Sequence, residues 1–465
     1  METASSLDRC RGLAAAGIDE LRAGKARASS TQTDTFMKRN SKDSELRERA
    51  RQVIPKGMYG HESVALLPED FPQFFARAEG TYLWDCDDNR YVDYMCAFGP
   101  NLLGYRHRGV EEAVRAQAAM GDTMTGPSEA MVVLAEDLVS MIGHAAWAMF
   151  CKNGSDATSM AMVTARAYRD RNKILVARGT YHGAAPWNTP SPKGITAEDR
   201  AHIVYFDYND LDSAADAFRK ADGDVAGVFA TPFRHETFAD QYAPSADYAV
   251  GLRKLCDDAD ALLILDEVRT GFRLARDCSW SVHGVQPDLS AWGKVLANGY
   301  PISALVGSEK VRSAASGIYV TGSFWFSAVP MAAAIATLRE IRTTEYLERI
   351  IANSARLRAG IAAQASAHGI PVRQTGPSQM PQILFDDDPD MRKGYFWTGF
   401  AARSGAYLHP YHNMFFNAAM TTDDVDNTLD ITDRAFAELK RQLPTLPAQS
   451  NELLLLRLAS QPKRN

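Results

Sequence analysis

Four short segments combine residue types and spacings that could carry out chemistry. The first lies in residues 261–272, where the apolar run 261–265 is followed by Asp266 and Glu267. If this run is a strand of a parallel sheet, Asp266 lies at the carboxyl edge, where α/β folds bind ligands. A carboxylate there can pair with a pyridinium nitrogen, so that the protonated ring accepts electrons. The same acid could instead cap a helix or bind a metal, so this strand alone does not decide its role.

The second segment, residues 287–294, ends in Gly293 and Lys294 among small and apolar neighbours. Removing water from a lysine amine lowers its pKa and frees its lone pair, so that it can form an imine. A glycine–lysine pair is a weak signal by itself, because most lysines are simply solvated. The pair becomes significant because Lys294 lies 28 residues after Asp266 (294 − 266), among small and apolar neighbours.

Residues 150–158 form the third segment, a short apolar run followed by a small polar turn and the start of a helix. Gly154 permits close approach of the backbone, and with Ser155 it could bind a phosphate through free helix amides. The alternative is ordinary helix capping by Asn153 or Ser155. The fourth segment, residues 178–183, offers Tyr181 for stacking on a planar cofactor and places His182 beside it. Ordinary packing is the alternative for this pair.

The elements that must position these segments follow an alternating pattern from about residue 105. Short apolar runs occur between helix-like stretches such as 157–169 and 245–257. The runs are residues 148–150, 173–176, 202–206, 225–230, 262–265 and 302–306. Strands buried on both faces and separated by helices predict an α/β fold with a mainly parallel sheet. The carboxyl ends of those strands are then the expected ligand edge.

The ends of the chain predict a second, smaller α+β domain. A chain of 465 residues is too long for one simple core. We expect Ser41 to cap a helix that runs to about Val53, a hairpin over residues 82–94, and a long helical region from Pro330 to about Gly369. The predicted division is a flexible extension (1–42), a first part of the small domain (43–104), a large domain (105–330), the rest of the small domain (331–443) and a tail (444–465).

Composition excludes several classes of protein. A net charge of −6 without a long basic stripe argues against a nucleic-acid partner. Six scattered cysteines with no metal-ligand spacing predict reduced thiols, a cytoplasmic location and no metal site. The N-terminus lacks the apolar core of a signal peptide, and the late apolar run 453–456 is too short to span a bilayer.

In their order and spacing, the four segments resemble the class III aminotransferases, which are pyridoxal-phosphate enzymes of fold type I. The resemblance is strongest to the glutamate-1-semialdehyde aminomutase-like branch and covers about residues 41–443. Its anchor segments are residues 82–85, 98–100, 153–157, 181–183, 266–273 and 293–294.

The resemblance implies roles for residues that contact the cofactor ring. Lys294 would form the Schiff base with pyridoxal 5'-phosphate and shuttle the proton. Asp266 would pair with the pyridine nitrogen, while Val268 and Tyr181 would lie against opposite faces of the ring.

The resemblance also implies how the cofactor phosphate is held. Gly154 and Ser155 would bind it from one subunit, and Ser323 in the segment 321–324 would reach it from the neighbouring subunit. This arrangement predicts at least a homodimer. The exact register near Ser323, and the choice between dimer and tetramer, stay open at this stage.

The substrate side departs from the aminomutases. Their N-terminal region carries an arginine that holds the substrate carboxylate, whereas the matching segment here contains Tyr59 and has Ser63 in the arginine's place. A neutral hydroxyl cannot form a bidentate charged clamp. Phe98 replaces a family tryptophan, and His409 and His412 stand near the expected substrate side. These histidines could also be structural or surface residues.

We therefore expect an aminotransferase that moves an amino group from a donor amino acid, with glutamate as the expected donor, to another ketone. The acceptor could be a cyclic biosynthetic intermediate or a keto acid held elsewhere, for which Arg234 and Arg106 are candidates. An intramolecular aminomutase is the alternative, and the missing arginine argues against it. A nucleotide-binding oxidoreductase lacks a GxGxxG motif after any predicted strand. A catalytically silent scaffold would have no reason to keep both Asp266 and Lys294.

Overall fold

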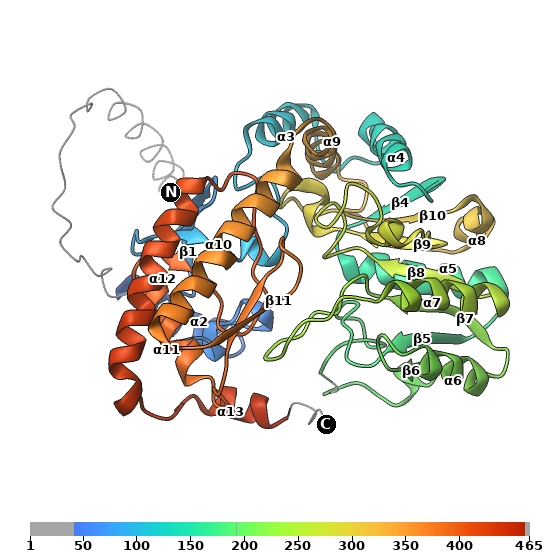
Figure 1. Ribbon diagram of the computed structural model, residues 1–465. Helices are drawn as coiled ribbons and strands as arrows, with labels where there is room; N and C mark the ends of the chain where they lie inside the picture. Colours follow the sequence, from blue (N-terminus) through green and yellow to red (C-terminus); the bar gives the residue numbers. More distant parts are fainter. Residues whose placement is uncertain (1–40, 192, 461–465) are drawn as a thin grey trace. The chain divides into compact units, whose positions relative to one another are not determined.

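A seven-stranded sheet organises the middle of the chain, in the order β4-β10-β9-β8-β7-β5-β6 (Figure 1). Its strands are β4 (Trp147–Cys151), β5 (Lys173–Ala177), β6 (Ile203–Phe206), β7 (Val225–Ala230), β8 (Leu262–Asp266), β9 (Leu289–Trp292) and β10 (Ser303–Gly307). Only β10 runs against its neighbours. The predicted mainly parallel sheet is therefore confirmed. The four-residue β9 was not predicted as a strand, because its small residues do not form a long apolar run.

Helices cover both faces of this sheet, as the continuous apolar strands predicted. Successive side chains of a strand point to opposite faces. In β5, Ile174 and Val176 pack with α5 (Gly154–Arg169), and Leu175 packs on the other face with α6 (Leu211–Ala221) and α7 (Ala246–Asp258). Both faces of the central strands are dry, so polar chemistry is confined to the strand ends.

The N-terminal and C-terminal parts of the chain share a second sheet. Its order is β1-β2-β3-β13, and β13 runs parallel to β3. The predicted hairpin is confirmed as the antiparallel pair β2–β3. The strands are β1 (Phe75–Glu79), β2 (Tyr82–Asp85), β3 (Arg90–Asp93) and β13 (Ala406–Tyr407), and β11 (Val372–Thr375) and β12 (Gln382–Phe385) form a separate pair.

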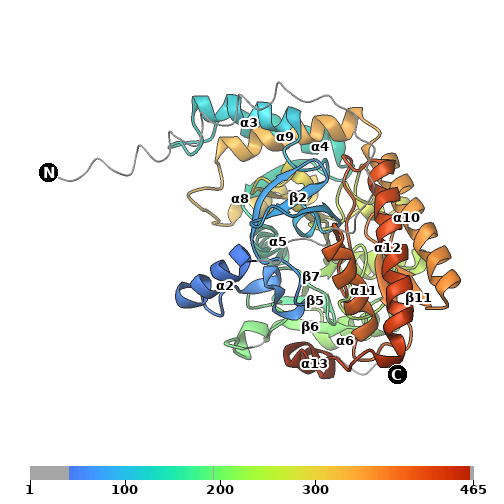
Figure 2. The same cartoon turned by 90° about the vertical axis from the view of Figure 1, so that its left-hand side faces the viewer.

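Long helices accompany these strands. In both views α10, α11 and α12 lie side by side, and α3 lies along α9 (Figure 2). The long helical region after Pro330 is two helices that are interrupted at Thr344 and Glu345. The helices are α2 (Ser41–Val53), α3 (Arg108–Met120), α4 (Glu129–Met141), α8 (Arg312–Gly317), α9 (Ala328–Thr343), α10 (Tyr346–His368), α11 (Arg392–Arg403), α12 (Thr422–Gln442) and α13 (Glu452–Ala459).

The computed structural model describes residues 41–191 and 193–460, which belong to one unit spanning Met37–Asn465. Residues 1–40 of the expected N-terminal extension lie outside the described residues, as does Cys10. Within the segment expected to be a tail, α13 packs Leu454 against Leu384, Met391 and Tyr395. In the described ranges no helix is both long enough and apolar enough to cross a membrane.

We predict that Gly104→Ala destabilises the fold more than Gly284→Ala. Both glycines have positive φ (+94° and +70°), so alanine is strained at each by about 1–2 kcal/mol. At Gly104 the new Cβ would also lie 2.6 Å from the Ala419 Cβ and 2.9 Å from the Gly80 oxygen, whereas Gly284 has open space. Overpacking adds about 1–3 kcal/mol. Denaturant unfolding of both variants measures the free energy of unfolding. Equal losses of stability would show that the backbone around Ala419 moves aside.

Candidate active site

The carboxylate of Asp266 lies at the end of β8, whose preceding residues are fully buried. Its Oδ2 is 2.8 Å from the Nδ1 of His182, and its Oδ1 accepts a hydrogen bond from the Val268 amide at 3.1 Å. The buried His182 ring stacks on Trp187 with 6.3 Å between ring centroids. These contacts orient Asp266 at the carboxyl edge of the sheet, which is where the sequence placed it.

Lys294 begins the turn that follows β9, and its backbone is left-handed (φ +45°). The Nζ donates a hydrogen bond to the Phe98 carbonyl at 3.0 Å. Burial, followed by the positive charges of Arg269 and Arg273, lowers the pKa of Lys294 to about 7. A large fraction of the amine is therefore neutral at neutral pH, and a neutral amine has the free lone pair that a nucleophile needs.

The start of α5 combines a cap with free amides. Asn153 accepts a hydrogen bond from the Asp156 amide at 3.0 Å, and Asp156 completes a capping box, so the capping alternative is correct for Asn153. Ser155 does not cap this helix, because its Oγ accepts from the Ala184 amide at 2.9 Å. Within the described chain, the amides of Gly154 and Ser155 donate to no protein acceptor. The helix end can therefore bind an anion.

Val268 leaves no room for a side chain at Gly154 and lies in ordinary contact distance of Gly293. A Cβ at Gly154 would lie 2.8 Å from the Val268 Cγ1, and a Cβ at Gly293 would lie 3.5 Å from the same atom. The start of α5, the end of β8 and the start of the Lys294 turn therefore meet at Val268. The Tyr181 ring is 54% exposed, so a flat ligand could cover it.

Of the two histidines expected near the substrate, His412 lies beside Phe98 and His409 lies against His412. The His412 ring meets Phe98 edge-on, with 5.6 Å between centroids. The Nδ1 of His409 accepts from the amides of Tyr411 and His412 at 3.3 and 3.1 Å. Burial lowers the pKa of His409 to about 3 and that of His412 well below its ordinary value. Both rings are therefore neutral groups at the site.

Arg269 and His235 lie near Lys294 as well, although the sequence analysis assigned them no role. The Nη1 of Arg269 donates to the Asn413 Oδ1 at 2.8 Å, and burial lowers the Arg269 pKa to about 10. Burial and then Arg269 lower the pKa of His235 well below the ordinary value. Arg269 follows Asp266 and His235 follows β7, so their position after a parallel strand was the signal that could have found them.

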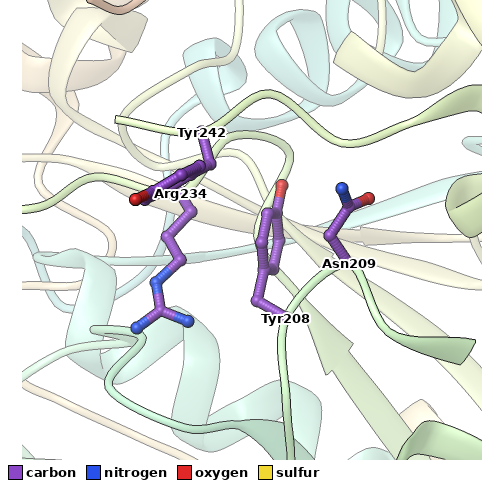
Figure 3. A pocket seen from close by; sticks show the side chains of 4 residues that line it. All are labelled: Tyr208, Asn209, Arg234 and Tyr242. Atoms are coloured by element: carbon purple, nitrogen blue, oxygen red, sulfur yellow. The ribbon is translucent and has the colours of Figure 1, made fainter. Parts of the chain in front are cut away.

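The other predicted substrate residues lie differently. Arg234 pairs with Glu236, Nε to Oε1 at 2.5 Å. It lines a cavity of about 340 Å³ with Tyr208, Asn209 and Tyr242 (Figure 3). The lining residues of this cavity come from the segments that follow β6 and β7. None of them is among the groups that shift the pKa of Lys294.

Four further candidates lie at or near the surface. Tyr59 is 69% exposed, and Ser63 uses its Oγ to accept from the Ala65 amide at 3.4 Å, at the start of a short turn. Arg106 is exposed and has a left-handed backbone. Ser323 is exposed in the loop between α8 and α9. Ser63 is thus a local capping residue in this structure.

The residues present fit pyridoxal phosphate. A partly buried lysine has a lowered pKa, and a carboxylate held by a histidine stands at the same sheet edge. Two free amides open α5, where any Cβ at Gly154 would strike Val268. Together these features provide an attachment point, a partner for a ring nitrogen and a place for a phosphate.

Comparison with known proteins agrees with this geometry. A family profile described as aminotransferase class-III matches residues 67–377. The chain belongs to the class III aminotransferases. It therefore has fold type I, uses pyridoxal phosphate and transfers amino groups, as its resemblance to this family predicted.

Three relatives place it within this family. The chain is 61% identical to an aminopentol aminotransferase of Sphingopyxis macrogoltabida, over 88% of this chain and 97% of the relative. The chain is also 61% identical to the FumI protein of Sphingopyxis sp. MTA144, whose structure is solved in the pyridoxal-phosphate internal aldimine form. That match has a TM-score of 0.87 and covers 89% of this chain and 99% of that chain. Glutamate-1-semialdehyde 2,1-aminomutase of Nitrosospira multiformis is 29% identical over 85% and 99%. The aminomutase alternative is thus the more distant.

We predict that Lys294 of the cofactor-free protein reacts at an unusually low pH. Because its pKa is lowered to about 7, the reactive neutral amine should appear as the pH rises through 7. The same inflection for an ordinary lysine lies at a pH of about 10.4. Reductive methylation at pH 6 to 10, followed by peptide mass spectrometry, measures this. In Arg269→Met the inflection should move upward because one positive charge is removed. An inflection for Lys294 near that of ordinary lysines in the wild-type protein would contradict the prediction.

Proposed function

We propose that this aminotransferase moves an amino group between a polyhydroxylated amine and a small keto acid. The keto acid becomes an amino acid when it receives the amino group, and the reverse direction returns it. The relative named aminopentol aminotransferase supports an amine that bears several hydroxyl groups. The observation that carries the proposal is a set of neutral histidines, His235, His409 and His412, near Lys294 and Phe98. The cyclic ketone that the sequence suggested stays a prediction.

Hydrogen bonds within the protein assign the free atoms of these histidines. The Gln241 Nε2 donates to the Met380 carbonyl at 3.3 Å, so its Oε1 accepts from the His235 Nδ1 at 3.2 Å. The His235 Nε2 is then an acceptor, and it is buried with no partner in the described chain. His412 donates from Nδ1 to the Asn413 carbonyl at 2.6 Å, which makes its Nε2 an acceptor as well.

Buried acceptors favour a ligand that brings donors. Leaving such an atom unpaired costs about 1–3 kcal/mol, which a substrate hydroxyl would recover. A carboxylate has no proton to donate to His235 or His412. The capping role of Ser63 supports the same conclusion, because no charged clamp stands where the aminomutases hold their substrate's carboxylate.

The proposed chemistry is centred on Lys294 and Asp266. Pyridoxal phosphate, when bound, supplies a carbonyl that exchanges with amines and a ring that withdraws electrons from the substrate. Lys294 is the proposed attachment residue, and its neutral Nζ is the proposed base that removes and returns the substrate proton. Asp266, oriented by His182, would hold a proton on the ring nitrogen.

The remaining cofactor contacts follow from the same geometry. Val268 and Tyr181 are the proposed residues against the two ring faces, supported by their positions beside Gly154 and Asp266. Gly154 and Ser155 are proposed to bind the phosphate through their free amides. His182 is proposed to act through Asp266, since the one hydrogen bond that its ring forms within the described chain goes to that carboxylate.

We propose a cytoplasmic homodimer with shared sites. In the loop that carries Ser323, Tyr319 is 90% exposed and Phe324 is 65% exposed. Large apolar side chains grouped on a surface often mark an interface, and this supports contact of Ser323 with a second subunit. Five described cysteines are free thiols, four of them buried, as expected in a reducing compartment.

We predict that Asp266→Ala retains cofactor but loses turnover. The phosphate site and Lys294 remain, whereas proton control at the ring nitrogen is lost, for which a loss of about 10²–10⁴-fold in kcat is expected. His182→Asn should show a smaller loss, because it only removes the group that orients Asp266. Absorbance titration with pyridoxal phosphate and steady-state rates measure the two effects. Normal turnover by Asp266→Ala would contradict the assignment of Asp266 to the ring nitrogen.

We also predict a preference for hydroxylated amines. With the same keto acid as acceptor, a polyhydroxylated alkyl amine should have a kcat/KM about tenfold or more above its deoxy analogue, since each satisfied acceptor contributes about 1–3 kcal/mol. His235→Phe should reduce this ratio, and His368→Phe should not, because His368 pairs with Asp433 on the surface of α10. Rapid conversion of glutamate-1-semialdehyde without an added amino donor would instead support the aminomutase alternative.

A further inference from the structure

Arg269 is a partly buried cation with few partners. Its one hydrogen bond in the described part of the chain goes to Asn413, and it forms no ion pair with a described carboxylate. Two other arginines have more partners. The partly buried Arg253 pairs with Asp288 at 2.8 Å, and the buried Arg273, which also lacks a described carboxylate partner, donates to the carbonyls of both Gly99 and Phe416.

The charge of Asp266 acts on Arg269, but the Asp266 oxygens are engaged by His182 and by the Val268 amide. A partly buried charge without a paired carboxylate is costly, so proteins rarely keep one without a use. The lowered pKa of Arg269, about 10, still leaves the guanidinium charged at neutral pH. Val268, the residue before Arg269, lies against both Gly154 and Gly293, which precedes the attachment lysine. The Arg269 charge accordingly acts on Lys294, Tyr181, His235 and His412.

Asn413 holds Arg269 in a fixed orientation. The Asn413 Nδ2 donates to the Met414 carbonyl at 3.0 Å, so its Oδ1 is the atom that faces the Arg269 Nη1. The remaining guanidinium donors are therefore available to a ligand. A planar guanidinium matches a carboxylate through two parallel hydrogen bonds.

We propose that Arg269 binds the carboxylate of the small keto acid, and of the amino acid formed from it, that alternates in the cleft with the hydroxylated amine. This inference rests on the proposed function, because an aminotransferase must accept two different substrates in one cleft. The neutral histidines suit hydroxyl groups, and Arg269 suits the carboxylate. Arg234 is not available for that role, since it is paired with Glu236 and lines another cavity.

Equilibrium binding to the holoenzyme tests the proposal without turnover. Propionate is an unreactive carboxylate, and propionamide is its uncharged counterpart. Arg269→Met should weaken propionate binding by about tenfold to a hundredfold, the effect of losing one charged hydrogen-bond partner, and leave propionamide binding unchanged. Arg269→Lys keeps the charge but loses the planar fork, so a smaller loss is expected. Arg234→Met is the matched control and should bind propionate normally.

Kinetics supply a second, independent measurement. In Arg269→Met the KM for a small keto acid should rise about tenfold to a hundredfold. Because Arg269 also lowers the pKa of Lys294, the single-turnover rate with a hydroxylated amine that lacks a carboxylate is compared at a pH where Lys294 is neutral in both proteins. There it should fall much less than the KM for the keto acid rises. Cofactor titration and thermal melting of each holoenzyme check that the variant is folded and loaded. If Arg269→Met does not fold, Arg269→Lys with the propionate titration still decides the question.

Three outcomes would overturn the proposal. Unchanged propionate binding by Arg269→Met shows that no carboxylate binds there. A loss of cofactor affinity with normal propionate binding shows that the anion partner is an oxygen of the cofactor. Equal losses for the amine and the keto acid show that Arg269 serves both half-reactions alike. If propionate binding depends on Arg269 but hydroxylated amines are not preferred, the proposed substrate class fails and the carboxylate site stands.

Discussion

The site depends on keeping a lysine amine uncharged among other buried charges. Removing Lys294 from water disfavours its ammonium form, and the nearby guanidinium groups of Arg269 and Arg273 act in the same direction. Asp266 opposes them, but its carboxylate is also engaged by His182 and by the Val268 amide. The balance lowers the Lys294 pKa to about 7. Nearly every other feature of the cleft serves to hold these charges in place.

The loop that carries Phe98 illustrates how the backbone meets this requirement. Cys96, Ala97, Phe98 and Gly99 all have positive φ, from 47° to 110°. Such a run is strained for residues other than glycine, and strain of this kind gathers at functional sites. The buried Asp93 carboxylate accepts the amides of Met95 and Cys96 at 2.7 and 2.9 Å. It thereby holds the turn that presents the Phe98 carbonyl to Lys294.

The two substrates of an aminotransferase impose a conflicting demand on this cleft. In the proposed reaction, a hydroxylated amine would need neutral hydrogen-bonding groups, whereas a keto acid would need a cation. Burial keeps His235 and His412 neutral while the much more basic Arg269 stays charged. The same dry environment therefore yields both kinds of partner, since the ordinary pKa values of histidine and arginine lie so far apart.

The sequence by itself determined the sheet, the chemistry-bearing segments and the family. Asp266 follows an apolar run, so its place at the carboxyl edge of the sheet could be predicted. The strand before Lys294 was not recognised from its residues, so the pairing of Lys294 with Asp266 came from the resemblance to the family. The sequence could not show that Arg269 lacks a carboxylate partner or that Arg234 already has one in Glu236. It also could not show that Ser63 caps a local turn or that the His235 Nε2 is left without a partner. Only the tertiary structure decided these, because a side chain's charge state and free atoms depend on burial and on neighbours that lie far away along the chain.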